Sequence, residues 1–582
     1  MKLLKKSLIA MGCVLALYGC KDAEPAFDHF PSADVEFTYN VDGDEYTLDY
    51  YVVSTIQFNN ISSKTGNIEW NFGDGETSTE ANPLHKYKKA GTYRVSLTID
   101  GVGTMTHPIL IYDIVPELSV KEQSTEIVEF NNTLMTFNLE LPNPENLKVK
   151  YVWTFPEGTV DANGNTVTTF TGYSDEQGNI DYPDAVKFKN IGSQKVQIAT
   201  WFDIDGENRR LEDTYLNVQV GCDTPAPTIY YAEKGGNIKA MKLLDQSKLP
   251  AGTKILPYDM GVSSGNNCFN LVYADVPVKD EDGKATTEQW IYILDAGKQY
   301  YYINDENGVL GDGKIDAMRP DGSGVNTVIT NVGGPAFADP YQGFASGEYL
   351  YYSDRNTGIS KIELTKRGEV QGKVLSGSTY SRDSYVIQNS LIPYYGRGIA
   401  YGAIHVAHQK LSDGWWYWAK NYSGNGIYRL KETDVYATQK EAEAKALPAP
   451  VMFSGIKPRA MVVDETRKAI YIWRIGAQKG FTAYDLPSLT DPGDEKVYNA
   501  FIAMDADPVN TTADEGVYTC QFALDKSSGR VYFCFRPEAN DGSKIPAGIC
   551  YYDPSTQKVA HYGDANDLGM GICINPNKTK LF

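Results

Sequence analysis

The stretch that decides the N-terminal fold is Trp70-Asn71-Phe72-Gly73-Asp74-Gly75. Trp70 and Phe72 are two positions apart, so their side chains point to the same face of a strand. Gly73-Asp74-Gly75 is typical of a turn that needs positive φ. Some twenty residues later, in Tyr93–Leu97, apolar residues alternate with polar ones. Both segments therefore predict strands that bury one face.

Two further segments accompany this stretch, Asn82–Tyr87 and Ala90–Thr98. In their order and spacing, the three segments resemble a PKD domain, which is an immunoglobulin-like β-sandwich. The resemblance implies such a domain over residues 31–116. Asp74 and His85 can be read as a metal-binding pair, but in this motif they serve the turn and the packing, so we predict no metal there.

A second sandwich of the PKD or immunoglobulin-like kind is predicted for residues 117–222. Val152–Gly158 repeats the aromatic strand and turn, although it lacks the Gly-Asp-Gly sequence. Val186–Gly192 leads into Lys195–Ile198 like the closing half of the first domain. Asp223–Pro227 then follows as a stiff linker.

Residues 228–582 repeat a short aromatic strand at intervals of about 55 to 65 residues. Its copies are Trp290–Asp295, Tyr349–Asp354, Trp415–Trp418, Ala469–Trp473 and Val531–Phe535. This period suits four-stranded propeller blades with long loops. Several copies continue into a turn and a second strand, as in Asn356–Leu364, and so resemble YWTD and NHL propeller blades.

Six other segments precede or follow these strands and are candidates for the innermost strand of each blade. They lie near Cys268–Tyr273, Gln342–Ala345, Ile399–His405, Arg459–Asp464, Thr519–Leu524 and Met570–Ile574. The sixth stands almost at the end of the chain, so its outer strands are expected from residues 229–233 and 237–244. Such closure removes two open sheet edges. The fold is therefore predicted to be all-β with a six-bladed propeller, and seven blades are the alternative if 229–244 builds its own blade.

The first residues of the chain predict export. Lys2, Lys5 and Lys6 precede an apolar run over 8–17 that is too short for a permanent membrane helix. The run ends in Leu17-Tyr18-Gly19-Cys20, which resembles a lipobox, where signal peptidase II cleaves before a diacylated cysteine. Residues 1–19 are then a signal peptide, Cys20 carries the lipid, and 20–30 form a tether. The acidic segment Lys21–Glu24 resembles surface-export signals of Gram-negative anaerobes, with a plain tether as the alternative.

The charge balance and the cysteines exclude several classes of partner. The chain has 54 basic and 74 acidic residues, and no basic cluster follows the signal, so nucleic acid is not an expected partner. No second apolar stretch reaches membrane length. The remaining cysteines lack a C-x-x-C pair and sit in apolar strands, so we predict buried side chains in preference to a zinc site. Disulfides are permitted in this compartment.

No catalytic constellation is recognisable. His405 and His408 are three positions apart, which places them on opposite faces of a strand. Neither a Gly-x-Ser-x-Gly elbow nor a P-loop occurs. The acidic, glycine-rich segment Asp305–Asp316 does not match the EF-hand register, so a solvated loop is expected, with a structural calcium ion as the alternative. We predict no catalytic residue, no cofactor and no metal ligand.

Aromatic side chains could bind sugar rings or peptides. Trp416, Trp418 and Trp473 lie within strands and are predicted to be core. Better candidates lie in the loops that enter the inner strands, because these loops crowd one mouth of the ring. The ligand-binding candidates are Asn266, Asn267, Asp339, Tyr341, Gln342, Tyr394, Tyr395, Arg397, Lys457, Arg459, Asp514, Glu515, Asn566 and Asp567.

The order of lipobox, PKD module and C-terminal propeller resembles the PKD-like family of bacterial lipoproteins. The resemblance implies a non-catalytic accessory protein at the outer membrane, facing the cell surface and working with SusC/SusD-type importers that capture glycans or peptides. The sandwiches would act as spacers beneath the propeller. Two alternatives stay open. One is a propeller enzyme, a polysaccharide lyase or glycoside hydrolase with its site in the channel, and the other is a surface adhesion protein.

Overall fold

The computed structural model of the chain describes residues 33–579 with internal gaps. The gaps are 43–48, 53, 122–126, 130–132, 142, 144–146, 176, 205–206, 222–223, 298–312, 331–339, 355–357, 366–369, 372–373, 376–378, 381–386, 389–406, 421–425, 432–450, 454–455, 475–479, 487–495, 504–520, 536–545 and 566–568. The lipidation segment around Cys20 lies outside the described residues. Within the described residues, no helix has the length and apolar composition needed to cross a membrane.

The first sandwich consists of two antiparallel sheets. One sheet has the order β1 (Phe37–Val41), β3 (Ile56–Asn60), β6 (Leu84–His85). The other has the order β2 (Tyr50–Tyr51), β8 (Gly103–Tyr112), β7 (Gly91–Ile99), β4 (Ile68–Asn71), β5 (Thr77–Ser78), with β2 parallel to β8. Trp70 and Phe72 are buried in the core between the sheets, as their spacing predicts.

The turn after β4 has the structural role that the sequence predicts. Gly73 has φ +84°, and a Cβ atom there would lie 2.7 Å from the Arg94 carbonyl oxygen. His85 Nε2 is hydrogen-bonded to Asp74 Oδ2 at 2.7 Å, and the Phe72 ring stacks on His85 at 4.0 Å. Asp74 Oδ1 also accepts the Glu76 N–H. Asp74 and His85 therefore hold the turn and pack the core.

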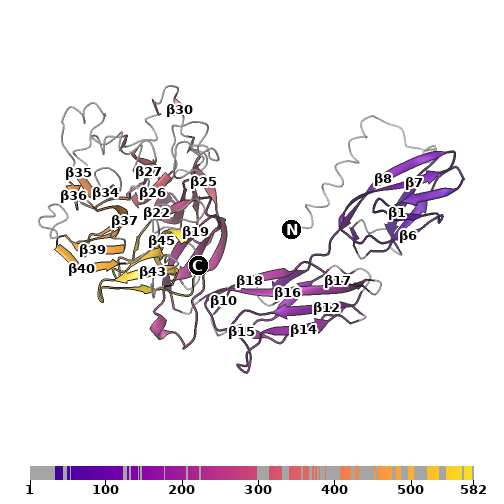
Figure 1. The fold of residues 1–582 in the computed structure, drawn as a ribbon, viewed down its shortest axis with the longest axis horizontal. Helices are drawn as coiled ribbons and strands as arrows, with labels where there is room; N and C mark the ends of the chain where they lie inside the picture. The colour runs from indigo at the N-terminus through magenta and orange to yellow at the C-terminus, as the bar shows by residue number, and fades with distance from the viewer. Residues whose placement is uncertain are drawn as a thin grey trace.

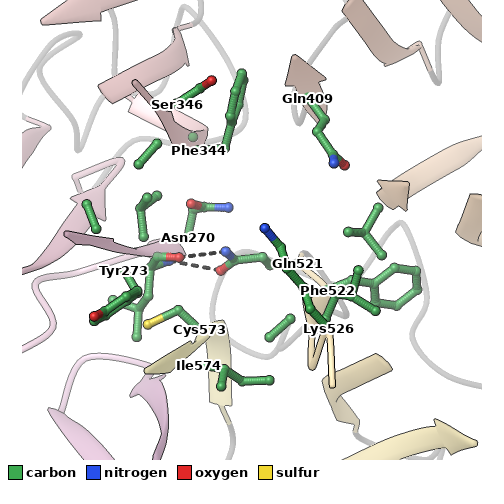
Figure 2. Close-up of a pocket in the computed structure, with 18 of the residues that line it drawn as sticks. Asn270, Tyr273, Phe344, Ser346, Gln409, Gln521, Phe522, Lys526, Cys573 and Ile574 are labelled. Atoms are coloured by element: carbon green, nitrogen blue, oxygen red, sulfur yellow. Dashed lines mark hydrogen bonds between the residues drawn. The ribbon is translucent and has the colours of Figure 1, made fainter. Parts of the chain in front are cut away.

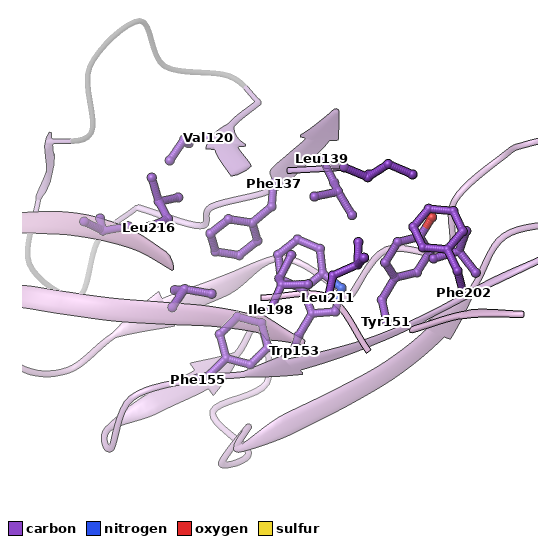
Figure 3. Packing of buried hydrophobic residues seen from close by; sticks show 14 of the residues in the cluster. Val120, Phe137, Leu139, Tyr151, Trp153, Phe155, Ile198, Phe202, Leu211 and Leu216 are labelled. Carbon is purple, nitrogen blue, oxygen red and sulfur yellow. The ribbon is translucent and has the colours of Figure 1, made fainter. Parts of the chain in front are cut away.

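The main sheet of the second sandwich repeats the strand order of the five-stranded sheet of the first. Its main sheet has the order β10 (Ile127–Glu129), β18 (Thr214–Gly221), β16 (Gly192–Ile204), β12 (Val149–Thr154), β14 (Thr169–Tyr173), and β17 (Glu207–Arg210) pairs with β16. Its parallel edge strand β10 corresponds to β2. The pairs β9 (Glu117–Val120) with β11 (Phe137–Glu140), and β13 (Thr159–Asp161) with β15 (Val186–Phe188), complete it. Figure 3 shows Phe137, Trp153 and Phe155 together in its core.

The described residues of the C-terminal part form six sheets of four or five strands each, besides one two-stranded hairpin. The first sheet has the order β45 (Gly569–Thr579), β19 (Ala226–Glu233), β20 (Asn237–Lys242), β21 (Tyr258–Ser263), and the second has β22 (Cys268–Lys279), β23 (Ala285–Asp295), β24 (Lys314–Met318), β25 (Asn326–Thr330), β29 (Val370–Gln371). The third sheet has the order β26 (Pro340–Ser346), β27 (Tyr349–Asp354), β28 (Gly358–Glu363), β32 (Ile387–Gln388), and the fourth has β33 (His408–Lys410), β34 (Trp415–Lys420), β35 (Gly426–Lys431), β36 (Val451–Met452). The fifth sheet has the order β37 (Pro458–Asp464), β38 (Ala469–Arg474), β39 (Gly480–Asp485), β40 (Lys496–Ala503), and the sixth has β41 (Ala523–Leu524), β42 (Val531–Phe535), β43 (Gly548–Asp553), β44 (Lys558–His561). A 3₁₀ turn, η2 (Gln246–Lys248), and the hairpin β30 (Val374–Leu375) with β31 (Thr379–Tyr380) lie between them.

The first strand of each sheet contacts the first strand of the next, in the circuit β45, β22, β26, β33, β37, β41 and back to β45. The six sheets thus form a closed, propeller-like ring (Figure 1). The C-terminal strand β45 pairs with β19 from the start of the ring, and β19 pairs with β20. The prediction that both ends of this region share one sheet is therefore confirmed, and residues 229–244 do not form a sheet of their own.

One boundary prediction was wrong. The predicted linker over 223–227 ends earlier, because β19 begins at Ala226, which pairs with Thr579. Pro227 is accommodated where the register shifts, since a proline without an N–H is tolerated at such irregularities. The inner strand predicted near Ile399–His405 lies outside the described residues, and the described part of the fourth sheet begins with β33.

Core predictions for the ring are confirmed where the structure describes them. Trp416, Trp418 and Trp473 are each at most 1% exposed. Four of the cysteines, Cys268, Cys534, Cys550 and Cys573, are buried free thiols. Cys222 and Cys520 lie outside the described residues.

The second sandwich is joined to the ring by backbone pairing. Ile191 donates its N–H to the Lys254 carbonyl at 3.0 Å and accepts the Leu256 N–H at 2.8 Å. Lys254 also forms an ion pair with Glu157 at 2.7 Å. The segment Lys254–Leu256 is itself fixed to the ring, because the Ile255 N–H donates to the Asp564 carboxylate at 2.9 Å. The sandwich thus adds a short parallel bridge to the base of the ring (Figure 1).

Candidate functional site

A cavity of about 760 Å³ lies at the centre of the ring. All six sheets contribute to its wall through β22, β26, β33, β37 and β45 and through residues 521–525 at β41 (Figure 2). A binding site for a small ligand usually has a volume of about 300–1,000 Å³. The channel is therefore large enough to hold a ligand.

The cavity extends to the end of the ring where the inner strands finish. Its lining there includes both charge signs and hydroxyl groups, contributed by Asp275, Ser346, Lys410, Ser412, Glu465, Asp525, Lys526, Ser527 and Lys578. We call this set the exit rim. Its carboxylates and ammonium groups are mixed, so the exit rim favours neither strongly acidic nor strongly basic ligands.

Gln521 spans the wall of the channel and binds two other strands. Its side-chain amide donates to the Leu271 carbonyl at 2.6 Å and accepts the Leu271 N–H at 2.9 Å. The same oxygen accepts the Ile572 N–H at 2.7 Å (Figure 2). Gln409 forms the same pair of hydrogen bonds with Val463. Its Nε2 donates to the Val463 carbonyl at 3.1 Å, and its Oε1 accepts the Val463 N–H at 2.8 Å. Both glutamines satisfy backbone groups that the innermost strands would otherwise leave open.

A Gln521→Leu variant is expected to lower the free energy of unfolding of the ring by about 2 kcal/mol, because three backbone groups lose their partner. Differential scanning calorimetry of the purified protein measures this loss. Gln246→Leu is the matched control, since Gln246 is exposed on a 3₁₀ turn and its replacement should leave the transition unchanged. Equal melting temperatures for Gln521→Leu and the parent would show that Gln521 does not hold the ring together.

Asn270 contributes a buried side-chain amide to the described wall of the channel. The residue is 1% exposed, and its Nδ2 donates to Gln342 Oε1 at 2.8 Å. Its Oδ1 has no hydrogen-bond partner among the described residues. A buried acceptor without a partner is unfavourable, so this position suits a ligand donor or a water molecule. Figure 2 shows the Asn270 amide close to the end of the Gln521 side chain, which binds the neighbouring residue Leu271.

An aromatic cluster forms the wall between β26 and β33. The Phe344 ring stacks on Tyr351 at 5.3 Å and meets Trp416 edge-on at 5.5 Å. His408 is 6% exposed and packs edge-on against Phe344 at 5.3 Å. His408 is thus packed into the aromatic wall, and His405 lies outside the described residues.

Two side chains in the wall could be taken for catalytic groups, but their surroundings keep them protonated. Cys573 is buried, and desolvation raises the pKa of its thiol, which disfavours the nucleophilic thiolate. Desolvation, reinforced by a hydrogen bond to Asp275 at 2.6 Å, likewise raises the pKa of Tyr273. The Tyr273 hydroxyl also accepts a hydrogen bond from Asn577 at 2.7 Å. The lining thus offers polar contacts and no activated nucleophile among these groups.

The described residues contain no cluster of three or more His, Cys, Asp or Glu side chains that could hold a metal ion. Most of the predicted acidic loop, residues 305–312, lies outside the described part. Asp316 at its end pairs with Lys314 at 2.6 Å and accepts a hydrogen bond from Thr327 at 2.8 Å.

The structure places six of the predicted ligand-binding residues. Gln342 lines the cavity, whereas Tyr341 is buried against Phe269 at 5.4 Å. Asn266 is exposed and Asn267 is buried, and both donate backbone N–H groups to the Asp295 carboxylate. Lys457 is exposed and Arg459 is buried.

The other eight predicted positions lie outside the described residues, namely Asp339, Tyr394, Tyr395, Arg397, Asp514, Glu515, Asn566 and Asp567. Binding by the entering loops therefore stays a prediction.

Burial raises the pKa of Asp295, and this carboxylate holds the loop before β22 by accepting the backbone N–H of Asn266.

The sequence interpretation did not anticipate Asn270, Gln409 or Gln521. A signal for them was available, because four of the six inner strands carry an amide residue near their start, at Asn270, Gln342, Gln409 and Gln521. Amides near the start of several inner strands are unusual for apolar strands, and here all four line the cavity.

Comparison with known proteins identifies the first sandwich. A family model described as PKD domain matches residues 40–108. The N-terminal sandwich is a PKD domain. A match of 96 residues to collagenase ColA of Bacillus cereus has 38% identity and covers 15% of this chain and 10% of that protein. A match of 126 residues to the pre-pro-metalloprotease PrtV of Vibrio cholerae has 29% identity and covers 21% of this chain and 14% of that protein.

The matches to curated proteins thus span a small part of each relative, 10% to 14% of its length in these two cases. Among solved structures, a quinonprotein alcohol dehydrogenase-like protein from Bacteroides thetaiotaomicron is similar over 78% of this chain and 98% of that chain, with 14% identity and a TM-score of 0.33. The match to a putative 6-phosphogluconolactonase from Bacteroides uniformis covers 59% of this chain and 83% of that chain, with 15% identity and a TM-score of 0.31. The match to a gluconolactonase from Xanthomonas campestris covers 59% of this chain and 89% of that chain, with 10% identity and a TM-score of 0.30.

Proposed function

We propose that this chain is a lipid-anchored, non-catalytic binding protein on the outer surface of the outer membrane, where it serves a SusC/SusD-type nutrient importer. In this proposal the ring is a six-bladed propeller that binds a neutral polar ligand, a glycan or a peptide segment, in its channel. The two sandwiches hold the propeller away from the lipid on Cys20.

The observation that carries the binding role is the channel itself. It combines a volume of about 760 Å³ with the unpartnered Oδ1 of Asn270 and a rim of mixed charge. Amide groups donate and accept hydrogen bonds without carrying charge. They therefore suit sugar hydroxyls or peptide groups better than phosphates or other anions.

The observation that supports a non-catalytic role is the state of two nucleophilic groups in the wall, Cys573 and Tyr273. Burial raises the pKa of the Cys573 thiol, and the Tyr273 hydroxyl is hydrogen-bonded to Asp275 and Asn577. Export is supported by the lipobox sequence at Leu17–Cys20 and by the PKD domain.

An Asn270→Leu variant tests the channel as the binding site. The mature protein, purified in detergent, is titrated calorimetrically with pools of neutral oligosaccharides and of short peptides. The parent is expected to bind one pool, and Asn270→Leu is expected to bind it at least tenfold more weakly, since the buried acceptor is lost. Thr154→Leu, on the exposed outer face of the second sandwich, is the control and should bind like the parent.

Mass spectrometry of the recovered ligand tests the absence of catalysis. Its mass is expected to be unchanged after long incubation with the parent protein. Cleavage of the ligand that the Asn270→Leu variant no longer performs would instead establish an enzyme with its site in the channel. No binding of either pool by the parent would contradict the binding role.

A further inference from the structure

The outer face of the second sandwich carries a row of alternating aromatic and cationic side chains. Tyr173 pairs with Lys150, Lys150 with Trp201, and Trp201 with Arg210, so the row crosses β14, β12, β16 and β17. Adjacent strands are about 4.8 Å apart, so the row is about 14 Å long. We call it the aromatic–cation row.

The cations of this row lie against the aromatic rings. Lys150 Nζ is 5.2 Å and the Arg210 guanidinium 5.5 Å from the centre of the Trp201 ring, and the two approach from neighbouring strands on opposite sides of β16. Lys148 lies 5.8 Å from the Tyr173 ring. These are cation–π distances. Aromatic and cationic groups are thus held together at one surface.

A second pair lies farther along the same face. Lys195 Nζ is 3.7 Å from the centre of the Tyr215 ring, on β16 and β18. Lys195 is six positions from Trp201 in β16, which is about 20 Å along the strand. Tyr215 is 46% exposed and Tyr173 is 44% exposed. The row and this pair therefore form one extended, accessible surface.

The opposite face of the same sheet is core. Tyr151, Trp153 and Ile198 point inward and are buried against β9 and β11 (Figure 3). The alternation of strands then requires Lys150, Trp201 and their partners to point outward. Core packing consequently does not explain why large aromatic residues occur on the outer face.

The cations of this face contrast with the acidic balance of the whole chain. The chain carries a net charge of −20. Lys148, Lys150, Lys195 and Arg210 lie on this face, and Arg210 pairs with Asp213 at 2.6 Å. No ion pair involves the three lysines within the part of the chain that the structure describes. The face is therefore complementary to a negatively charged ligand.

The geometry points to this outer face as a binding site for an acidic polysaccharide, one that carries uronate or sulfate groups. Aromatic rings stack on the apolar faces of sugar rings, and the flanking ammonium and guanidinium groups pair with the acidic substituents. The cations of the row are about 10 Å apart. Such sparse cations on an acidic chain suit a glycan with one charge per one or two sugars, and they do not suit the dense charge of nucleic acid.

This site is separate from the channel and does not depend on it. The test uses the mature, detergent-purified protein with chondroitin sulfate as the sulfated probe, polygalacturonate as the uronate probe, dextran as a neutral glycan and a DNA duplex as a plain polyanion. Biolayer interferometry at low and moderate salt measures binding. One or both acidic glycans are expected to bind more tightly than dextran and DNA.

Variants locate the site on the face. Trp201→Ala is expected to weaken binding of the acidic glycan at least tenfold, and the double variant Lys150→Gln, Lys195→Gln is expected to weaken it and to reduce its salt dependence. Trp201→Phe keeps an aromatic ring and should retain most of the binding. Calorimetry of every variant shows whether it is folded, so that weaker binding by Trp201→Ala is not confused with unfolding. Lys64→Gln, on an exposed loop of the PKD domain, and Asn270→Leu in the channel should bind like the parent.

Three outcomes would overturn the proposal. They are failure of the parent to bind either acidic glycan, binding of dextran or DNA as tight as that of the acidic glycans, and unchanged binding by Trp201→Ala together with the double lysine variant. Because Asn270→Leu acts on the channel alone, failure at this face is distinguishable from failure of the channel function.

Discussion

A Cys20→Ser variant is expected to keep residues 1–19, to carry no lipid and to be absent from the outer membrane. The reason is chemical, because the thiol of Cys20 is the group that receives the diacylglycerol, and in lipoproteins cleavage follows this modification. Intact-mass spectrometry of the purified protein measures both changes. The parent should lack the leader and gain the mass of its acyl chains.

Cys13→Ser is the matched control, since Cys13 lies in the predicted leader and leaves with it. This variant should be processed, lipidated and sorted like the parent. A leader that is removed from Cys20→Ser, giving a soluble exported chain, would show an ordinary signal peptide. Protease treatment of whole cells adds the orientation, and a surface protein should be digested without lysis.

A Gly192→Ala variant is expected to lower the free energy of unfolding by about 3 kcal/mol. Gly192 has φ +104°, where an L side chain is strained, and a Cβ atom would lie 2.1 Å from the Leu256 carbonyl oxygen. That carbonyl belongs to the loop that pairs with Ile191, so relief of the clash must break the joint between the second sandwich and the ring. Calorimetry measures the loss of stability.

Gly164→Ala separates backbone strain from the clash. Gly164 has φ +86° in the same sandwich, but a Cβ atom there meets nothing within 4 Å. Its replacement should cost only about 1 kcal/mol. Limited proteolysis provides a second measurement, because an undocked sandwich in Gly192→Ala should be cleaved from the ring near residues 221–226. Similar costs for the two variants would mean that the Gly192 contact does not hold the joint.

The ring closure could be predicted from sequence because it follows from counting strands. The segment near Met570–Ile574 was expected to be an inner strand, and residues 229–244 were expected to supply its outer strands. One sheet built from these two segments removes two open sheet edges. The pairing of β45 with β19 agrees with this reasoning.

The channel wall could not be predicted in the same way. Gln521 and Leu271 are 250 positions apart, and no periodicity links a side chain to a backbone at that separation. The joint at Ile191 likewise depends on a loop between the second and third strands of the ring, which no local pattern marks. The aromatic–cation row was missed because its residues come from four strands and align only once the register is known.

Purification from solubilised outer membranes tests the central claim most directly. The affinity-tagged parent protein is extracted from cells in mild detergent, and its companions are identified by mass spectrometry, with Cys20→Ser cells as the control for location. The proposed function predicts recovery of a SusC/SusD-type importer in stoichiometric amount with the parent and its absence from the control. Recovery of the parent alone, from membranes in which the importer is present and intact, would contradict it.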